Sequence, residues 1–272
     1  MIEIPEAQTL ARQIDATLTG KTITSAVAGA SPHGFAWYFG EPGAYGQLLN
    51  GTTISGAVAH GGRPEILAGD MHLCFGDGVN LRYLAPGDKR PAKHQLLLEF
   101  DDGSALFATV QMYGGLWAFP DGANDDPYYL VGKNKPSPLE SAFDKAYFLS
   151  LLTDTKLSAK AFLATQQRIP GLGNGVLQDI LWQAQIHPKR KMGTMDDAAL
   201  DQLFASVKSV LQEMTAGGGR DTEKDLFGQP GSYHVILCRL TDQTPCPRCG
   251  ATIKRMAYLG GNVYVCDGCQ PV

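Results

Sequence analysis

The sequence predicts an α+β chain of several domains, with an antiparallel β-sandwich or barrel first, a helical region second and a small metal-binding module last. Three observations predict this order. Residues 22–119 read as strands, residues after 140 follow a helical period, and four paired cysteines lie near the C-terminus. With 272 residues, 44% of them hydrophobic, the chain is long enough to form about two domains.

The N-terminal region begins with a helix and continues with strands. Pro5 to Leu18 opens with a proline and repeats apolar residues at helical spacing, which predicts an amphipathic helix. From Thr22 to Phe119, short apolar or alternating runs are separated by turn residues. Gln95–Phe100 and Ser104–Val110 flank Asp101-Asp102-Gly103, which indicates a β-hairpin.

The second region is helical. Asp121 to Pro138 is rich in Pro, Gly, Asn and Lys, and it is interpreted as an exposed linker. A later apolar stripe ends at Met214, and it predicts a helix with Thr194 as its N-cap and Gly217 as its stop.

Two shorter helices are predicted on either side of a turn. They cover Ala159 to Thr165 and Val176 to Ala184, and the Gly- and Pro-rich segment from Arg168 to Asn174 separates them. This pattern indicates a variant of the helix-turn-helix, in which Gly171 and Gly173 permit a close backbone approach.

Four cysteines at the C-terminus form a C-x2-C-x16-C-x2-C array: Cys246, Cys249, Cys266 and Cys269. This spacing is typical of one tetrahedral zinc ion, and four thiolates leave no open position for catalysis. We therefore expect one structural Zn²⁺ per chain. The alternative is two disulfides, which we disfavour because no secretory leader is evident and we expect a cytoplasmic protein.

The overall charge gives no evidence of a nonspecific nucleic-acid binder. The net charge is −4, so nucleic-acid binding requires a locally basic face. No apolar run approaches the length of about 18 residues that indicates a membrane span. We expect no membrane association, no organic cofactor and a monomeric chain.

Three motifs together resemble the formamidopyrimidine-DNA glycosylase and endonuclease VIII family. They are the opening Met1–Glu6, the segment Gln166–Pro188 with its Gly-Leu-Gly-Asn turn, and the four-cysteine finger. The resemblance covers nearly the full chain. It implies an N-terminal β-sandwich with flanking helices, a helix-two-turn-helix domain and a zinc finger, with damaged double-stranded DNA held in the cleft between the two halves. We expect domains at 1–130, 141–225 and 226–272, with a linker at 131–140.

The resemblance also implies DNA base-excision repair by a bifunctional DNA glycosylase and abasic-site lyase acting on oxidised bases or abasic sites. In this family the N-terminal amine, normally of a proline, attacks C1′ and forms a Schiff base. Glu3 matches the family's catalytic glutamate and Glu6 its second motif glutamate. Without the resemblance, two acids at this position would be interpreted as favouring the start of a helix.

The proline position is Ile2, which changes the expected nucleophile. If Met1 is retained, the free amine lies about 3.8 Å of chain away from its usual place. If Met1 is removed, the primary amine of Ile2 is available to form the imine. Both routes remain open at this stage.

The resemblance implies DNA contacts from four residues on both halves: Arg63, Lys160, Asn174 and Tyr113. Taken singly, each such residue is more often a solvated surface residue than a DNA ligand, and only their joint alignment with the turn and the finger favours DNA.

Three other positions depart from the family. Asp77 and Met112 replace the methionine and arginine that fill the gap left by an everted base, and Gly261 replaces a phosphate-binding arginine in the finger. These losses favour an alternative, a catalytically silent protein that binds damaged DNA. In a third hypothesis the finger contacts protein or RNA instead. If the protein is a repair enzyme or a silent protein that binds damaged DNA, we expect it to be cytoplasmic and associated with the nucleoid.

Overall fold

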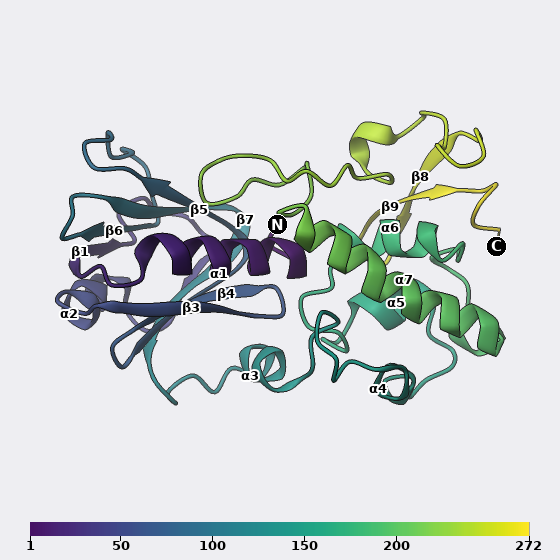
Figure 1. Cartoon of the computed structure of the whole chain (residues 1–272), viewed down its shortest axis with the longest axis horizontal. Coiled ribbons are helices and arrows are strands. Elements are labelled where there is room, and N and C mark those ends of the chain that lie inside the picture. The colour runs from purple at the N-terminus through teal and green to yellow at the C-terminus, as the bar shows by residue number, and fades with distance from the viewer. Residues whose placement is uncertain (272) are drawn as a thin grey trace.

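The computed structural model describes residues 1–271 and has two halves that lie side by side along its long axis (Figure 1). The N-terminal half is a β-sheet with helices α1 and α2. The C-terminal half contains helices α3 to α7 and the hairpin β8–β9. The N-terminus lies at the junction of the two halves.

The N-terminal half contains the following elements: α1 (Ile4–Leu18), β1 (Ile23–Ala28), β2 (Ala36–Tyr38), η1 (Pro42–Ala44), α2 (Tyr45–Leu49), β3 (Ile54–His60), β4 (Arg63–Ala68), β5 (Met71–Leu84), β6 (Leu96–Phe100) and β7 (Ala105–Pro120). The strands form one sheet in the order β1-β6-β7-β5-β4-β3. Its pairings are antiparallel, except that β2 runs parallel to β7. The predicted antiparallel architecture and the β6–β7 hairpin are confirmed.

Helix α1 contributes to the cores of both halves. Leu10 and Ile14 pack in the core of the sheet, as the apolar period predicts, whereas Ile4 packs in the core of the helical half. The start of α1 is fixed by a capping box between Glu3 and Glu6, in which the side chain of each accepts from the backbone of the other. The first residues of the chain therefore join the two halves.

The C-terminal half contains α3 (Pro127–Asn134), α4 (Lys145–Ser150), α5 (Ala159–Ala164), α6 (Val176–Gln183), η2 (Met192–Thr194), α7 (Asp197–Ala216), η3 (Arg239–Thr241), β8 (Ile253–Tyr258) and β9 (Gly261–Cys266). Helices α5 and α6 lie where the sequence predicts them. The long helix α7 ends at Gly217, also as predicted.

Two local predictions are wrong. The N-cap of α7 is Asp196, which accepts from the backbone N–H of Ala199, and Thr194 lies in the preceding turn η2. The segment 121–138 is not an exposed linker throughout, because α3 begins at Asp126-Pro127, a cap followed by proline at the first helical position. Tyr129 of this helix is buried against Phe119.

Among the helices formed by residues 1–271, none combines the length and apolar character that crossing a membrane requires.

Candidate active site at the junction of the two halves

The glycine-rich turn before α6 lies directly against the β3–β4 hairpin. Gly171 has a left-handed backbone (φ +79°), and a Cβ atom there would lie 2.0 Å from the backbone nitrogen of Gly62. Only glycine permits this approach. The sequence predicts a close backbone approach at this turn, and the structure identifies the hairpin of the other half as its partner.

Glu3 holds the same turn from the other side. Its carboxylate accepts three backbone N–H groups, from Gly173 (3.1 Å), Gly175 (2.8 Å) and Val176 (2.9 Å). These donors form the N-terminus of α6, where unpaired amides and the helix dipole favour a negative charge. Glu3 is thus buried and bonded to the helical half.

Arg220 completes a buried charge cluster with Glu3 and Glu6. Its guanidinium donates to both carboxylate oxygens of Glu6 (3.0 and 2.8 Å), and its Nη1 lies 3.5 Å from Glu3. Burial opposes the charge of Arg220, but the two glutamates outweigh burial, so the pKa of Arg220 rises above its ordinary value. Arg220 also donates to the carbonyl of Met1 at 3.2 Å. Sequence analysis missed this residue.

The N-terminal amine lies beside a pocket at the junction. Met1 is 43% exposed, and its amine lies 2.7 Å from Oε2 of Glu223. Ile2 is fixed, because its side chain packs in the core of the sheet and its N–H donates to the carbonyl of Asp77 (2.8 Å). The amine that lies at the junction in the structure is that of Met1.

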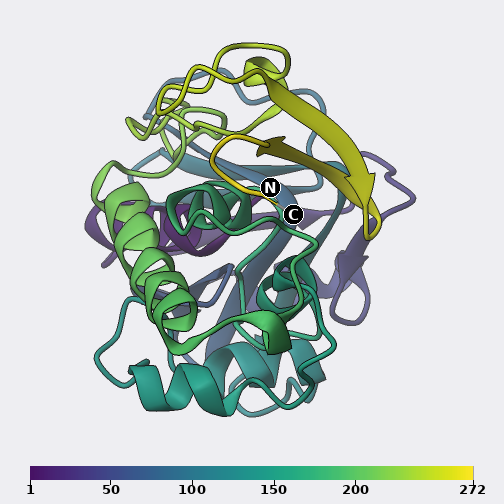
Figure 2. The ribbon, with the colours of Figure 1, turned by 90° about the vertical axis from the view of Figure 1, so that its right-hand side faces the viewer.

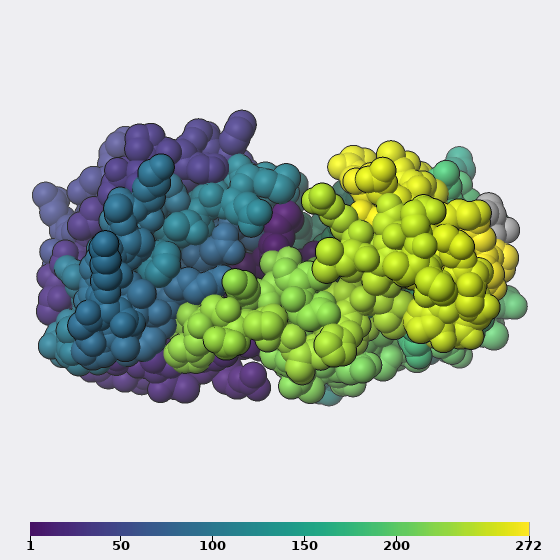
Figure 3. All heavy atoms as spheres, turned by 90° about the horizontal axis from the view of Figure 1, so that it is seen from above, coloured from purple at the N-terminus to yellow at the C-terminus, as the bar shows by residue number. Residues whose placement is uncertain are grey.

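The pocket beside the amine has a volume of about 240 Å³. Its walls come from the N-terminus, the middle of β5, the bend of β7 and residues 222–224. In Figure 3 the surface is hollowed between the two halves, and N-terminal atoms are visible in the hollow. Met1 lines the pocket and is partly exposed, so a ligand in the pocket can reach this residue.

Asp77 and Arg63 lie together on the sheet side of the junction. Burial raises the pKa of Asp77, and the charges of Arg63 and the N-terminal amine oppose that rise. The guanidinium of Arg63 lies 4.6 Å from the ring centre of Trp117. Asp77 has a left-handed backbone (φ 61°), as does Met112 in the bend of β7.

Met112 and Tyr113 lie in a bulge of β7 at the edge of the pocket. The register of β5 and β7 shifts here, and residues 111–113 fall outside the regular pairing. Met112 is 67% exposed, whereas Tyr113 lies against Trp37, with ring centres 5.6 Å apart. The bulge therefore presents an exposed apolar side chain beside the pocket.

Lys160 and Asn174 both contact the hairpin β8–β9. Lys160 is only 4% exposed and its Nζ donates to the carbonyl of Tyr258 (2.6 Å). Asn174 donates to the carbonyl of Asn262 (2.9 Å). A Cβ atom on Gly261 would lie within 4 Å of both side chains. The two candidate phosphate ligands therefore lie together beside Gly261, where the resemblance implies an arginine. Arg63 and Tyr113 lie on the other half.

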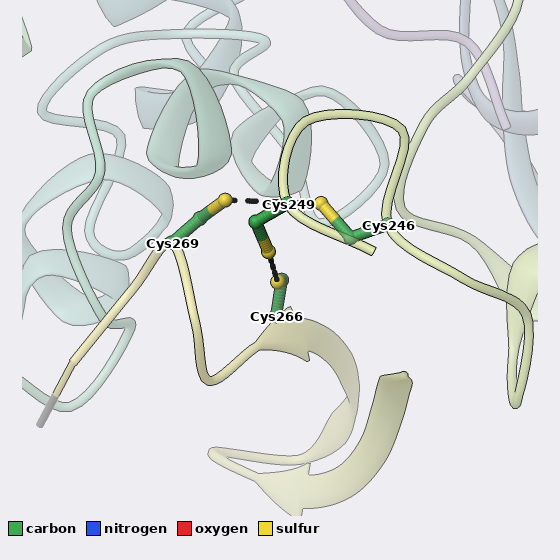
Figure 4. A group of neighbouring side chains, drawn as sticks. All are labelled: Cys246, Cys249, Cys266 and Cys269. Atoms are coloured by element: carbon green, nitrogen blue, oxygen red, sulfur yellow. Dashed lines mark hydrogen bonds between the residues drawn. The ribbon is translucent and has the colours of Figure 1, made fainter. Parts of the chain in front are cut away.

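The four cysteines converge, as the spacing predicts (Figure 4). Their Sγ atoms all lie within 4.8 Å of one another, with Cys246 and Cys269 3.7 Å apart and Cys249 and Cys266 3.3 Å apart. A metal–sulfur distance of about 2.3 Å places tetrahedral ligands roughly 3.8 Å apart. The cluster therefore fits a metal ion, and the thiols are not paired as disulfides.

The finger packs against α6, and its strand β9 contacts this helix (Figure 2). Trp182 of α6 donates from Nε1 to the sulfur of Cys246 (3.4 Å). The guanidinium of Arg248 lies 3.8 Å from the centre of the same ring and donates to the carbonyl of Trp182. These contacts fix the orientation of the finger relative to the helical half.

Asp179 of α6 predicts a pH dependence of stability. It is buried and accepts the N–H groups of Ile236 (2.9 Å) and Leu237 (2.8 Å). Burial raises its pKa to about 6, and the hydrogen bonds offset only part of that rise. The unfolded value is lower, about 3.9, so its contribution to stability is full below about pH 4 and is lost as the pH rises through 6, roughly 3 kcal/mol in total. The free energy of unfolding of the wild type and of Asp179→Asn is measured with urea between pH 4 and 7. If the difference in free energy between the two proteins does not change with pH, burial does not raise the pKa of Asp179 as described.

Comparison with known proteins agrees with this geometry. Residues 135–225 match the model described as formamidopyrimidine-DNA glycosylase H2TH domain. The formamidopyrimidine-DNA glycosylases of Lactococcus lactis subsp. cremoris and Geotalea uraniireducens are 28% and 29% identical to the chain, and each alignment covers 99% of the chain and at least 99% of the relative. Among solved structures, a complex of Lactococcus lactis Fpg with DNA containing an abasic site covers 99% of the chain and 100% of that protein, with a TM-score of 0.85 and 25% identity. A complex of the same Fpg with DNA containing an oxidised pyrimidine has a TM-score of 0.84 and 26% identity.

These findings define a class of protein that combines an N-terminal antiparallel sheet, a helix-two-turn-helix domain and a C-terminal four-cysteine cluster. The chain is similar to formamidopyrimidine-DNA glycosylases over nearly its full length, and residues 135–225 match their H2TH domain.

Proposed function

We propose that this protein takes part in DNA base-excision repair, and that it binds damaged double-stranded DNA in the hollow between its two halves. The N-terminal amine would attack C1′ of the damaged or abasic nucleotide, form a Schiff base and lead to strand cleavage. The position of Met1 carries this proposal, because this residue is half-exposed and lines the pocket at the junction. The Lactococcus lactis relative binds DNA with an abasic site in its complex.

The proposed catalytic set contains the amine of Met1, with Ile2, Glu3 and Glu6 as the residues that position it. The side chain of Ile2 is held in the core, and the backbone carbonyl of Met1 is held by Arg220, which the two glutamates fix in turn. If Met1 is removed in the cell, the amine of Ile2 takes its place.

Arg63, Lys160, Asn174 and Tyr113 are the proposed DNA contacts. A phosphate oxygen is a stronger partner for a lysine than a neutral carbonyl, because a hydrogen bond between charged groups is roughly twice as strong. We therefore propose that phosphate replaces the finger carbonyls at Lys160 and Asn174 when DNA binds. The protein would act as a monomer on chromosomal DNA, with one Zn²⁺ that stabilises the finger and takes no part in the reaction.

Borohydride trapping tests this function. Untagged protein is incubated with an abasic-site duplex and borohydride, and the covalent adduct is quantified and digested. We expect an adduct on the peptide that carries the N-terminus. Tight binding without an adduct would instead favour the second candidate, a catalytically silent protein that recognises damaged DNA. The residues Ile2, Asp77 and Gly261, at positions where the resemblance implies proline, methionine and arginine, favour that candidate.

A further inference from the structure

One carboxylate faces the N-terminal amine, and it is not that of Glu3. Among residues 1–271, Glu223 supplies the one carboxylate within 4.0 Å of the amine, with a separation of 2.7 Å. The oxygens of Glu3 already accept three backbone N–H groups and face Arg220. Glu3 is therefore poorly placed to exchange a further proton, whereas Glu223 is in direct contact with the reacting nitrogen.

Glu223 is held in this position by the residues around it. Its backbone N–H donates to the carbonyl of Arg220 (3.1 Å), which closes a turn, and its other carboxylate oxygen lies 4.0 Å from the guanidinium. Arg220 is itself fixed by Glu6. The side chain of Glu223 is 28% exposed and lines the pocket, so a ligand in the pocket contacts both the amine and this carboxylate.

We infer that Glu223 is a catalytic residue that exchanges protons with the N-terminal amine during imine formation. This inference rests on the proposed function. The carboxylate accepts a proton from the ammonium, and the free amine attacks the aldehyde carbon C1′ of an open abasic sugar. The new C–N bond forms as the C=O π bond breaks. Glu223 then transfers protons from the nitrogen to the former carbonyl oxygen, which leaves as water. Overall, the ammonium and the aldehyde give a protonated imine and one water.

Four other charged residues lie around the amine, and two of them offer alternative roles. Arg220 and Lys224 flank Glu223 on its own segment, Glu6 lines the pocket from α1, and Asp77 faces the amine from β5. Asp77 is the alternative proton acceptor, and Lys224 is an alternative nucleophile. Both alternatives are distinguishable by substitution and by mapping of the crosslinked peptide.

The test measures the rate of borohydride-trapped adduct formation with an abasic-site duplex for the wild type, Glu223→Gln, Glu223→Asp and Asp77→Asn. Asparagine tolerates the left-handed backbone at position 77, which makes Asp77→Asn a matched comparison. Glu213→Gln on α7 is the distant control. Thermal unfolding and the dissociation constant for the same duplex are measured for each variant.

We expect Glu223→Gln to slow adduct formation about 100-fold at pH 7. Affinity for the duplex should stay within about two-fold. Glu223→Asp should recover part of the rate, and Asp77→Asn and Glu213→Gln should react faster than Glu223→Gln.

Three results would overturn the inference. If Glu223→Gln reacts as fast as the wild type or faster, the glutamate merely holds the ammonium, while the proposed lyase chemistry stands. If Asp77→Asn alone loses the rate, Asp77 is the proton acceptor. If the wild type forms no adduct at its N-terminus, or forms it at Lys224, the proposed amine chemistry fails together with this inference.

Discussion

Replacing Arg220 with methionine is expected to lower the free energy of unfolding by about 3 to 5 kcal/mol. Methionine fills much of the same space but leaves Glu3 and Glu6 buried without their cation. Removing one partner from a buried ion pair costs far more than the pair contributes as a whole, because the remaining charge is uncompensated. Urea unfolding at neutral pH measures the change.

Arg12→Met is the matched control, since Arg12 is an exposed residue of α1. Its substitution is expected to change the stability by no more than about 0.5 kcal/mol. Equal effects of the two substitutions would show that the cluster around Arg220 is not a stabilising feature. A restored stability in the triple variant with Glu3→Gln and Glu6→Gln would support uncompensated charge as the cause.

Cys249→Ser is expected to abolish metal binding and unfold the finger. The four sulfurs are arranged for one tetrahedral ion, and such an ion contributes about 10 to 16 kcal/mol to the folding of small zinc modules. We expect zinc content to fall from one ion per chain to none. Hydrogen exchange should show loss of protection in β8–β9, while the sheet of the N-terminal half stays protected.

Cys238→Ser is the control for this experiment. Cys238 belongs to the same region but lies outside the cluster of four, so this variant should keep its zinc. If β8–β9 remains protected in Cys249→Ser, the contacts of the finger with α6 suffice for its folding and the metal is not required for it.

Local patterns predict much of the fold. The period of α1 and the turn around Gly171 involve residues close in the chain, and both predictions are confirmed. The four cysteines also converge, as their spacing predicts. The errors are also local. Asp196 replaces Thr194 as a cap, because two residues with capping side chains lie two positions apart and the turn η2 decides between them.

The site itself was less predictable. Arg220 contacts residues more than 200 positions away, and a charged loop residue after three glycines carries no signal of burial. Glu223 is in the same situation, because its place beside Met1 depends on the folding of both halves. The resemblance identifies Lys160 and Asn174, but their contacts with the finger depend on the path of a hairpin that has glycine at position 261.

The insertion of the first six residues between the halves has a consequence for biogenesis. These residues are synthesised well before their partners at positions 173–176 and 220. A nascent chain that has completed only the sheet therefore carries two acids and an apolar Ile4 with no place to bury them. The proposed nucleophile can be held in place only after residue 220 has been synthesised, so we expect a shorter chain not to position it.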